Sequence, residues 1–208
     1  LDMIGAARPS IADPFLPNKI EQGNVDDIRE CIGCNICISG DNTVTPIRCT
    51  QNPTMGEEWR RGWHPENFPE KKSAAKILVV GAGPAGLECT RALGHRGYEI
   101  VLAEAGAELG GRVTKESRLP GLAAWARVCD YRVGQIEVMP NVEVYLESEL
   151  SAEHVREFEA DHVVLATGSY WRNNGIGRAN TKAIAGCEGI NVFTPDDIIG
   201  GADVTGPV

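Results

Sequence analysis

The pattern of hydrophobic and polar positions from Ile77 onward predicts strands alternating with a helix. The apolar run 77–80 is short and ends at glycines, which is typical of a buried strand. Residues 85–96 have the pattern of a helix that ends near Gly97, and residues 99–103 are apolar and β-branched enough for the next strand. The succession predicts an α/β unit.

Two further elements follow in the same style. Apolar side chains recur at helical spacing over residues 122–136, which predicts a helix with one face packed inward. Over residues 142–146 apolar and polar side chains alternate, and we therefore expect a half-buried strand.

The pattern becomes weaker toward the end of the chain. Ser151 is placed to cap a short helix. The apolar run 163–166 predicts another buried strand, and residues 169–193 have the weak periodicity of a long loop. Thr194 and the residues after it have the signature of a helix start, with a capping hydroxyl, a proline and two acids.

The first 70 residues differ from the rest in composition. They are rich in Cys, Pro, Asn and Trp and have little helical periodicity after Cys31. Residues 1–5 resemble the end of a buried strand entering a glycine loop, and this segment lacks the charged and apolar regions of a signal peptide. Residues 71–76 are interpreted as an exposed linker. Because residues 200–208 have the composition of a loop, we expect the chain to be an internal part of a larger enzyme.

Composition narrows the class of protein. The 208 residues are 42% hydrophobic and 24% charged, as in a folded globular protein of one large or two small domains. The formal net charge is −9 without any block of Lys or Arg, which argues against nucleic acid or an anionic membrane as partner. No apolar run approaches the ~20 residues of a membrane span. We expect a cytoplasmic protein.

Four of the seven cysteines form one motif, in which Cys31, Cys34 and Cys37 are spaced three apart and Cys49 follows after eleven residues. Three such thiolates can bind three irons of a cubane while a later loop supplies the fourth ligand, so the spacing predicts a [4Fe–4S] site. A zinc site would use two separated pairs, and the odd number of cysteines disfavours a disulfide framework.

The other three cysteines are not interpreted as ligands. Cys89 and Cys129 fall on predicted helices among apolar neighbours, which favours small core residues. Cys187 has no assignment.

A glycine loop, Gly81-Ala82-Gly83-Pro84-Ala85-Gly86, joins the first predicted strand to its helix, and an acid ends the next strand. In dinucleotide-binding folds the glycines allow a tight turn, close approach to a pyrophosphate and close helix packing, and the helix N-terminus faces the phosphates. The acid would accept hydrogen bonds from ribose and repel a 2′-phosphate, which argues against an NADP-type ligand. The alternative is a tight turn without a ligand. The candidate residues are Gly81, Gly83, Pro84, Ala85, Gly86 and Glu104.

A second glycine pair follows the acid. Gly110 and Gly111 precede Arg112, and we expect this loop to lie against the same nucleotide with Arg112 near phosphate or ribose. By itself the segment is also compatible with an ordinary turn.

In combination, these motifs resemble the iron–sulfur flavoprotein family that contains trimethylamine, dimethylamine and histamine dehydrogenases and 2,4-dienoyl-CoA reductase. Cys31–Cys49 is similar to the family's cluster loop and Gly81–Arg112 to its adenine-dinucleotide domain. Gly5-Ala6-Ala7-Arg8-Pro9 resembles the last loop of its flavin-binding (β/α)₈ barrel, which implies that Arg8 holds the FMN phosphate. Without the resemblance, Arg8 would be interpreted as part of a surface salt bridge.

Within the family, several segments are similar to the amine dehydrogenases, and the arginine–proline loop usual in the reductases is absent. These segments are 49–53, 56–65, 119–122, 166–168 and 171–175. Thr167 and Gly168 are assigned to the nucleotide site on this basis. Trp59, Trp63 and His64 are interpreted as packing around the cluster.

The resemblance also implies an architecture for the whole α/β chain. The expected parts are the end of an FMN-binding barrel (1–25), a [4Fe–4S] segment (26–70), a linker (71–76), an incomplete Rossmann-like ADP- or FAD-binding domain (77–193) and the lead into a second nucleotide-binding-like domain (194–208).

The function that the resemblance implies is oxidation of a small amine, N-methylated or histamine-like, at FMN. Electrons would pass singly through the cluster to an external acceptor, typically an electron-transferring flavoprotein. The adenine nucleotide would be ADP without a redox role, as in the amine dehydrogenases, or FAD, as in the reductases. The full-length enzyme is expected to be a homodimer. No catalytic residue is nominated, because the family's substrate pocket and covalent flavin attachment lie in the preceding barrel.

Two other functions remain open from the sequence. The first is an NAD(P)H-dependent dienoyl-CoA or enoate reductase that uses FMN, a [4Fe–4S] cluster and FAD. The second is a detached electron-transfer module with a cluster and a structural nucleotide.

Overall fold

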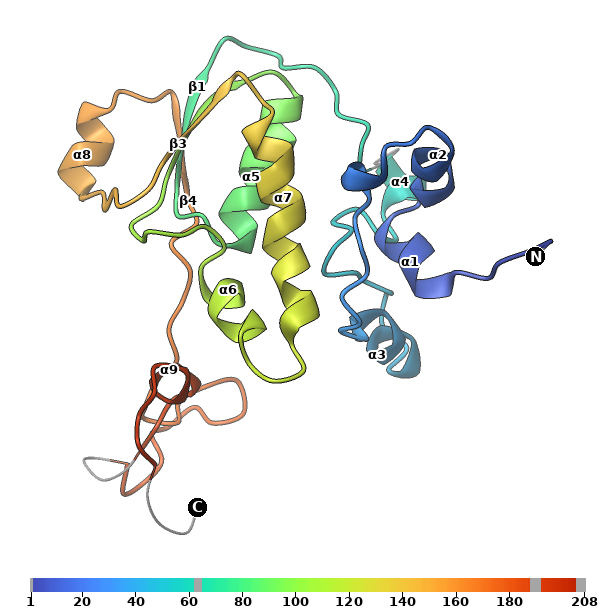
Figure 1. Cartoon of the computed structure of the whole chain (residues 1–208). Coiled ribbons are helices and arrows are strands. Elements are labelled where there is room, and N and C mark those ends of the chain that lie inside the picture. The colour runs from blue at the N-terminus through green and yellow to red at the C-terminus, as the bar shows by residue number, and fades with distance from the viewer. Residues whose placement is uncertain (1, 62–64, 188–191, 205–208) are drawn as a thin grey trace. The chain divides into compact units, whose positions relative to one another are not determined.

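A computed structural model describes residues 2–61, 65–187 and 192–204, except for the side chains of residues 60 and 61. The chain divides into two compact units, Leu1–Thr167 and Gly168–Val208. The first unit holds a four-stranded parallel sheet with helices on both faces (Figure 1). The expected α/β fold class is confirmed.

The sheet places the end of its first strand at a change of direction. The strand order is β3-β2-β1-β4, so the chain runs from β1 to β2 and β3 on one side and later to β4 on the other. Such a point, at the carboxyl ends of parallel strands, is where open α/β sheets bind ligands. The strands are β1 (Lys76–Val80), β2 (Glu99–Ala103), β3 (Val142–Tyr145) and β4 (His162–Leu165).

Side chains of β1 and β2 alternate between two cores. Ile77 and Val79 join Leu87 of α5 (Pro84–His95) and Ile136 of α7 (Arg127–Glu137) in the core on one face. Leu78, Val80 and Val101 face the other way and pack beside α8 (Ala152–Glu157). Figure 1 shows α5 and α7 together on one side of the sheet and α8 on the opposite side.

Most predicted elements from residue 77 onward are confirmed within one or two residues. The predicted helix over 122–136 begins as a 3₁₀ turn, η2 (Ala123–Ala126), and continues as α7. Ser151 caps α8, since its hydroxyl accepts a hydrogen bond from the backbone N–H of His154 at 3.2 Å. In the second unit Thr194 caps α9 (Pro195–Ile199) in the same way.

Two strands are more exposed than predicted. β4 was expected to be buried, but Leu165 is 72% exposed because β4 forms one edge of the described sheet. β3 forms the other edge, and Val144 is 38% exposed. Residues 2–5 do not form the expected strand end; Met3 is 87% exposed, and the structure pairs no strand with this segment.

Several short helices were not predicted from the sequence. They contain four to seven residues each, too few to establish a clear hydrophobic period. They are α1 (Ala7–Ala12), α2 (Leu16–Glu21), α3 (Ile36–Asn42), α4 (Glu58–Arg61) and α6 (Arg112–Ser117), and a 3₁₀ turn, η1 (Val25–Asp27), lies among them.

A buried ion cluster joins residues 13–29 to Glu66. Asp13 is fully buried and accepts hydrogen bonds from Lys19 Nζ at 2.7 Å and from the backbone N–H of Arg29 at 2.9 Å. Lys19 Nζ also donates to Glu66 Oε1 at 2.9 Å and to the carbonyl of Asp27 at 2.7 Å. Burial alone would lower the pKa of Lys19, but the hydrogen bonds to Asp13 and Glu66 outweigh it and raise the pKa.

Replacing Asp13 by Asn should destabilise the fold strongly, because it leaves the buried Lys19 with an incomplete set of counter-charges. We expect a loss of about 3–5 kcal/mol in the free energy of unfolding, measured by urea denaturation. Glu108→Gln is the matched control, since it breaks an exposed pair with Arg118 and should cost at most about 1 kcal/mol. Equal losses in the two variants would contradict a structural role for the buried cluster.

Candidate functional site

The four cysteines of the predicted motif line one small hollow. Its wall contains Cys31, Cys34, Cys37 and Cys49. The chain curls between the first three because Gly33 and Asn35 adopt left-handed backbone conformations, with φ of 69° and 58°. Glycine and asparagine are the residues that tolerate this region best. The structure thus brings together thiols up to 18 residues apart in the sequence.

The thiols are not gathered around one point. Among the described residues, no group of three or more His, Cys, Asp or Glu side chains is placed to hold a single metal ion. A zinc ion would require four ligands near one centre, with Zn–S distances of about 2.3 Å. In a cubane each cysteine binds a different iron, so its sulfurs lie farther apart. The four unpaired thiols around one hollow are compatible with the four separate ligands of a [4Fe–4S] cluster.

Hydrogen-bond donors approach three of the four sulfurs. The backbone N–H of Gly33 donates to Cys31 Sγ at 3.5 Å, and that of Gln51 donates to Cys49 Sγ at 3.3 Å. The hydroxyl of Thr50 lies 3.1 Å from Cys34 Sγ. Such donors stabilise negative charge on cysteine sulfur and tune the potential of a bound cluster.

The side chain of Gln51 fixes both ends of the cysteine segment to the α/β domain. Gln51 is fully buried, and its Nε2 donates to the carbonyls of Glu30 at 3.0 Å and Arg127 at 3.2 Å. Arg132 of α7 donates in turn to Gln51 Oε1 at 3.0 Å. Because Glu30 precedes Cys31 and Gln51 follows Cys49 by two residues, one amide anchors the start and the end of the motif.

A partly buried carboxylate extends this network to α5. Glu88 Oε2 pairs with Arg132 Nε at 2.8 Å, and Glu88 Oε1 pairs with Arg91 Nη2 at 2.8 Å. Burial alone would raise the pKa of Glu88, but Arg91, Arg132 and Arg29 outweigh it and hold the pKa below its usual value. Glu88 is therefore ionised over the physiological pH range.

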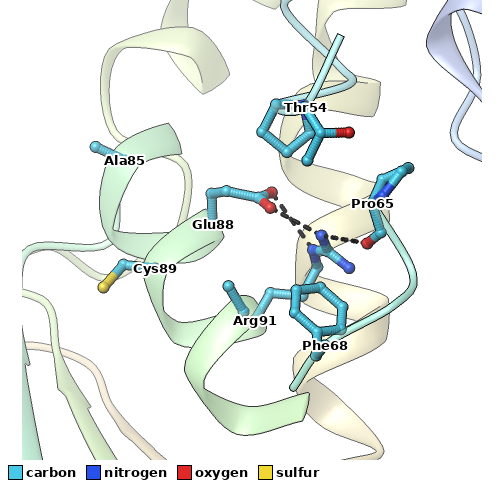
Figure 2. A pocket seen from close by; sticks show the side chains of 9 residues that line it. Thr54, Pro65, Phe68, Ala85, Glu88, Cys89 and Arg91 are labelled. Atoms are coloured by element: carbon cyan, nitrogen blue, oxygen red, sulfur yellow. Dashed lines mark hydrogen bonds and ion pairs between the residues drawn. The ribbon is translucent and has the colours of Figure 1, made fainter. Parts of the chain in front are cut away.

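Figure 2 shows the ion pair between Glu88 and Arg91 beside a cavity of about 410 Å³ that adjoins α5. Arg91 lies between Glu88 and the carbonyl of Pro65, to which its Nη2 donates at 3.2 Å. Its guanidinium also stacks over Phe68, with 5.1 Å between the guanidinium carbon and the ring centroid. Residues 65–68 are thereby attached to α5, which the Glu88–Arg132 pair connects to α7 and the cysteine segment.

The glycine loop at the start of α5 has the geometry of a dinucleotide turn. A Cβ on Gly81, which has φ of 98°, would lie 2.5 Å from the carbonyl oxygen of Ala166, and a Cβ on Gly86 would overlap the carbonyl of Gly81. These two glycines therefore serve packing within the protein. A Cβ on Gly83 would contact nothing within 4 Å, so the backbone there is open to a ligand.

The remaining backbone of this loop favours an anion. Pro84 is the first residue of α5, and no side chain caps the helix at Gly83. The first amides of a helix lack internal acceptors and attract phosphate. This arrangement accounts for the predicted Pro84 and Ala85 at the helix start.

The acid and the second glycine pair lie against the same loop. Glu104 accepts hydrogen bonds from the backbone N–H groups of Ala82 at 2.7 Å and Gly106 at 2.8 Å. Each carboxylate oxygen retains a second lone pair, which leaves it able to accept from a ribose hydroxyl. A Cβ on Gly111 would lie 3.3 Å from Gly83 Cα, and Arg112 follows as the first residue of α6.

The residues assigned by resemblance are placed as follows. The Cα of Thr167 would lie 3.1 Å from a Cβ on Gly81, so it borders the loop, whereas Gly168 begins the second unit. Arg8 donates to Asn35 Oδ1 and lines the cysteine hollow. Trp59 is 82% exposed, and its interpretation as a packing residue is wrong; Trp63 and His64 lie outside the described residues.

Comparisons with known proteins agree with this geometry. The family model described as pyridine nucleotide-disulphide oxidoreductase matches residues 75–197, more than half of the chain. The chain belongs to this family. A dimethylamine dehydrogenase from Hyphomicrobium sp. (strain x) is 45% identical over 99% of the chain and 29% of its own length.

Two solved structures are also similar. The 6-hydroxypseudooxynicotine amine oxidase from Pseudomonas geniculata N1 is 58% identical with a TM-score of 0.92, over 97% of this chain and 30% of that one. Histamine dehydrogenase from Rhizobium sp. 4-9 is 56% identical with a TM-score of 0.89, over 96% and 29%. The chain thus spans about three tenths of the length of these relatives. The resemblance to the amine dehydrogenases is confirmed, and together with the family it implies a flavin cofactor.

Four polar residues of the site were not identified from the sequence. They are Thr50, Gln51, Glu88 and Arg132. Thr50 and Gln51 directly follow Cys49, and their position beside a ligand is the one signal that could have found them. Glu88 and Arg132 look like ordinary charged positions of amphipathic helices, because only the fold reveals that the cysteine segment covers them.

Because the space around Gly83 is open, a substitution there should affect ligand binding without affecting the stability of the fold. Gly83→Ala should leave the free energy of unfolding nearly unchanged but weaken ADP binding by about 10- to 100-fold, because the new methyl group would occupy the approach of the pyrophosphate. Isothermal titration calorimetry with ADP measures the binding. Gly134→Ala is the control: its Cβ also meets nothing, and it should stabilise α7 by about 0.5–1 kcal/mol without affecting ADP. Unchanged ADP affinity in Gly83→Ala would contradict the assignment of the loop.

The anchoring role of Gln51 can be tested through iron content. Gln51→Ala should lower the iron and sulfide bound per protein and cost about 1–3 kcal/mol, because it removes one acceptor of the buried Arg132 and the amide donor to two backbone carbonyls. Anaerobic reconstitution followed by iron and acid-labile sulfide analysis measures the first effect. Gln22→Ala, at an exposed position, should retain the wild-type content. Full iron loading of Gln51→Ala would show that the hydrogen bonds of the Gln51 side chain are not needed for cluster binding.

Proposed function

We propose that this chain is the cluster- and nucleotide-binding part of a flavin-dependent amine dehydrogenase. In the proposed reaction a small amine, N-methylated or histamine-like, is oxidised at FMN held mostly by a preceding barrel domain. The observation that carries the proposal is the hollow lined by Cys31, Cys34, Cys37 and Cys49, in a chain 45–58% identical to a dimethylamine dehydrogenase and two amine-oxidising enzymes.

The four cysteine thiolates would hold the cluster. A bound [4Fe–4S] cluster supplies a centre that accepts and donates single electrons, which suits transfer to an external acceptor such as an electron-transferring flavoprotein. The protein's own contribution is to fix the thiols through Gln51 and to donate hydrogen bonds to their sulfurs. Arg8, which lines the same hollow, would hold the FMN phosphate, as the resemblance implies.

The nucleotide site would hold an adenine dinucleotide or its ADP part. The amides at the start of α5 would bind the pyrophosphate over Gly83, and Glu104 would orient the ribose. Arg112 and Thr167 would border the ligand, and Gly168, the first residue of the second unit, remains assigned to the nucleotide by the resemblance alone. ADP without a redox role is the form we propose, by analogy with the amine dehydrogenases that the chain resembles.

A second candidate function is an NAD(P)H-dependent reductase with FAD in this site. The same glycine loop and cysteine motif support it, and reductases occur among the relatives at lower identity, 31% for a cinnamate reductase and 33% for a 2-naphthoyl-CoA reductase. The amine dehydrogenase is favoured because its relatives match over more of the chain or at higher identity.

The proposal extends to the setting of the enzyme. We propose a cytoplasmic homodimer whose parts follow the boundaries expected from the sequence, namely 1–25, 26–70, 71–76, 77–193 and 194–208. Among the residues that the structure describes, no helix has the length and apolarity needed to cross a bilayer.

The decisive test identifies the released nucleotide and the reductant. The protein, expressed with the flanking sequence of its gene, is denatured and its nucleotides are separated by chromatography and mass spectrometry. We expect ADP among the released nucleotides and FMN retained on the denatured protein, because the family that the chain resembles attaches its flavin covalently. Anaerobic addition of a secondary or tertiary amine should bleach the flavin absorbance without nicotinamide. Stoichiometric FAD with flavin reduction by NADPH alone would instead establish the reductase.

A further inference from the structure

The hydroxyl of Thr50 faces a cysteine of the cluster motif. Thr50 Oγ1 lies 3.1 Å from Cys34 Sγ, well within the range of a hydrogen bond to sulfur. A cysteine bound to iron is a thiolate and has no proton to give, so in the loaded protein the hydroxyl must be the donor.

We propose that Thr50 raises the reduction potential of the bound cluster through this hydrogen bond. The proposal rests on the cluster assignment made above. Reduction adds negative charge that is shared by the cysteine sulfurs, and a hydrogen-bond donor stabilises the reduced form more than the oxidised form. Thr50 is thus a residue that tunes the cluster without binding iron.

Both partners of this hydrogen bond are held in place by the fold. Cys34 packs against the hydrophobic core of the sheet. Thr50 lies between the ligand Cys49 and the fully buried Gln51, whose backbone carbonyl and side chain both accept from Arg132. As a β-branched residue, Thr50 also has few rotamers to choose from. The short contact therefore follows from anchored neighbours on both sides.

Thr50 differs from the other donors in one respect that matters for a test. Gly33 and Gln51 donate to Cys31 and Cys49 from the backbone, and no substitution removes an N–H group there except proline. The Thr50 donor is a side chain and can be removed by an isosteric change. Because Thr50 is exposed in this chain, water replaces part of the lost hydrogen bond, and we expect a moderate effect.

The experiment is a redox titration followed by electron paramagnetic resonance on the cluster-loaded protein. Thr50→Val should shift the reduced-to-oxidised ratio at fixed potential about three- to tenfold toward oxidised, equivalent to a midpoint about 30–60 mV lower for a one-electron couple. Thr50→Ser, which keeps the hydroxyl, should retain the wild-type midpoint.

Thr45→Val is the matched control for the loss of a hydroxyl on the same loop. Thr45 Oγ1 bonds to the carbonyl of Gly40 and to Thr43 Oγ1, both at 3.1 Å, so this variant should titrate like the wild type. Should Thr50→Val fail to assemble its cluster, the pair Thr50→Ala and Thr50→Ser repeats the comparison, since the two differ by the hydroxyl alone.

The outcomes separate this proposal from the proposed function. An unchanged midpoint in Thr50→Val, or an equal shift in Thr45→Val, overturns the role of Thr50 and leaves the cluster assignment intact. A wild-type protein that shows no [4Fe–4S] signal after anaerobic reconstitution overturns both.

Discussion

The guanidinium of Arg132 joins the two halves of the candidate site. It donates to Gln51, which anchors the cysteine segment, and pairs with Glu88, which belongs to the helix that begins at the glycine loop. With 3% of Arg132 exposed, such a charge is tolerated only when its partners compensate for the lost hydration. Burial and the neighbouring Arg29 and Arg91 lower the pKa of Arg132, while Glu88 opposes them and keeps the group charged. The position of the cysteine segment on the domain depends on this arrangement, because α3, the helix within Cys31–Cys49, has seven residues and is too short to form a separate core.

The two candidate binding sites consequently share one rigid support. α5 presents its first turn to the nucleotide loop and Glu88, about one turn later, to the network behind the cysteines. α7 supplies Arg132 to the same network and Ile136 to the core below. Sites built on packed helices hold their geometry better than sites built on loops alone. The many loops around Cys31–Cys49 are acceptable for a cluster site because both ends of that segment are fixed to these helices.

The sequence was sufficient for those features that depend on local pattern. The period of apolar residues located β1, β2 and α5, and the spacing of cysteines and glycines identified both candidate sites before any coordinates. The burial of β4 could not be predicted, because an apolar run looks the same at the centre and at the edge of a sheet. The roles of Gln51 and Arg132 depend on contacts between residues 81 positions apart, which only tertiary packing brings together. The prediction that Trp59 packs around the cluster was wrong for a related reason, because composition does not tell which aromatic side chains face inward.

The balance of buried charge adds an argument for an anionic group beside this network. Among the side chains that the structure describes, Lys19, Arg29, Arg91 and Arg132 provide four positive charges, against three carboxylates from Asp13, Glu66 and Glu88. One positive charge is left over, in a region where uncompensated charge is expensive. Arg29 lies two residues before Cys31 in the sequence, and Arg132 contacts Gln51, two residues after Cys49, so two of the four cations are joined to the ends of the cysteine motif through the backbone or a hydrogen bond. Four thiolates around an iron–sulfur core carry a net negative charge. The network that anchors the motif is thus also complementary in charge to the anionic cluster that the motif is proposed to bind. Four neutral cysteine thiols without a bound metal would not require an excess of positive charge.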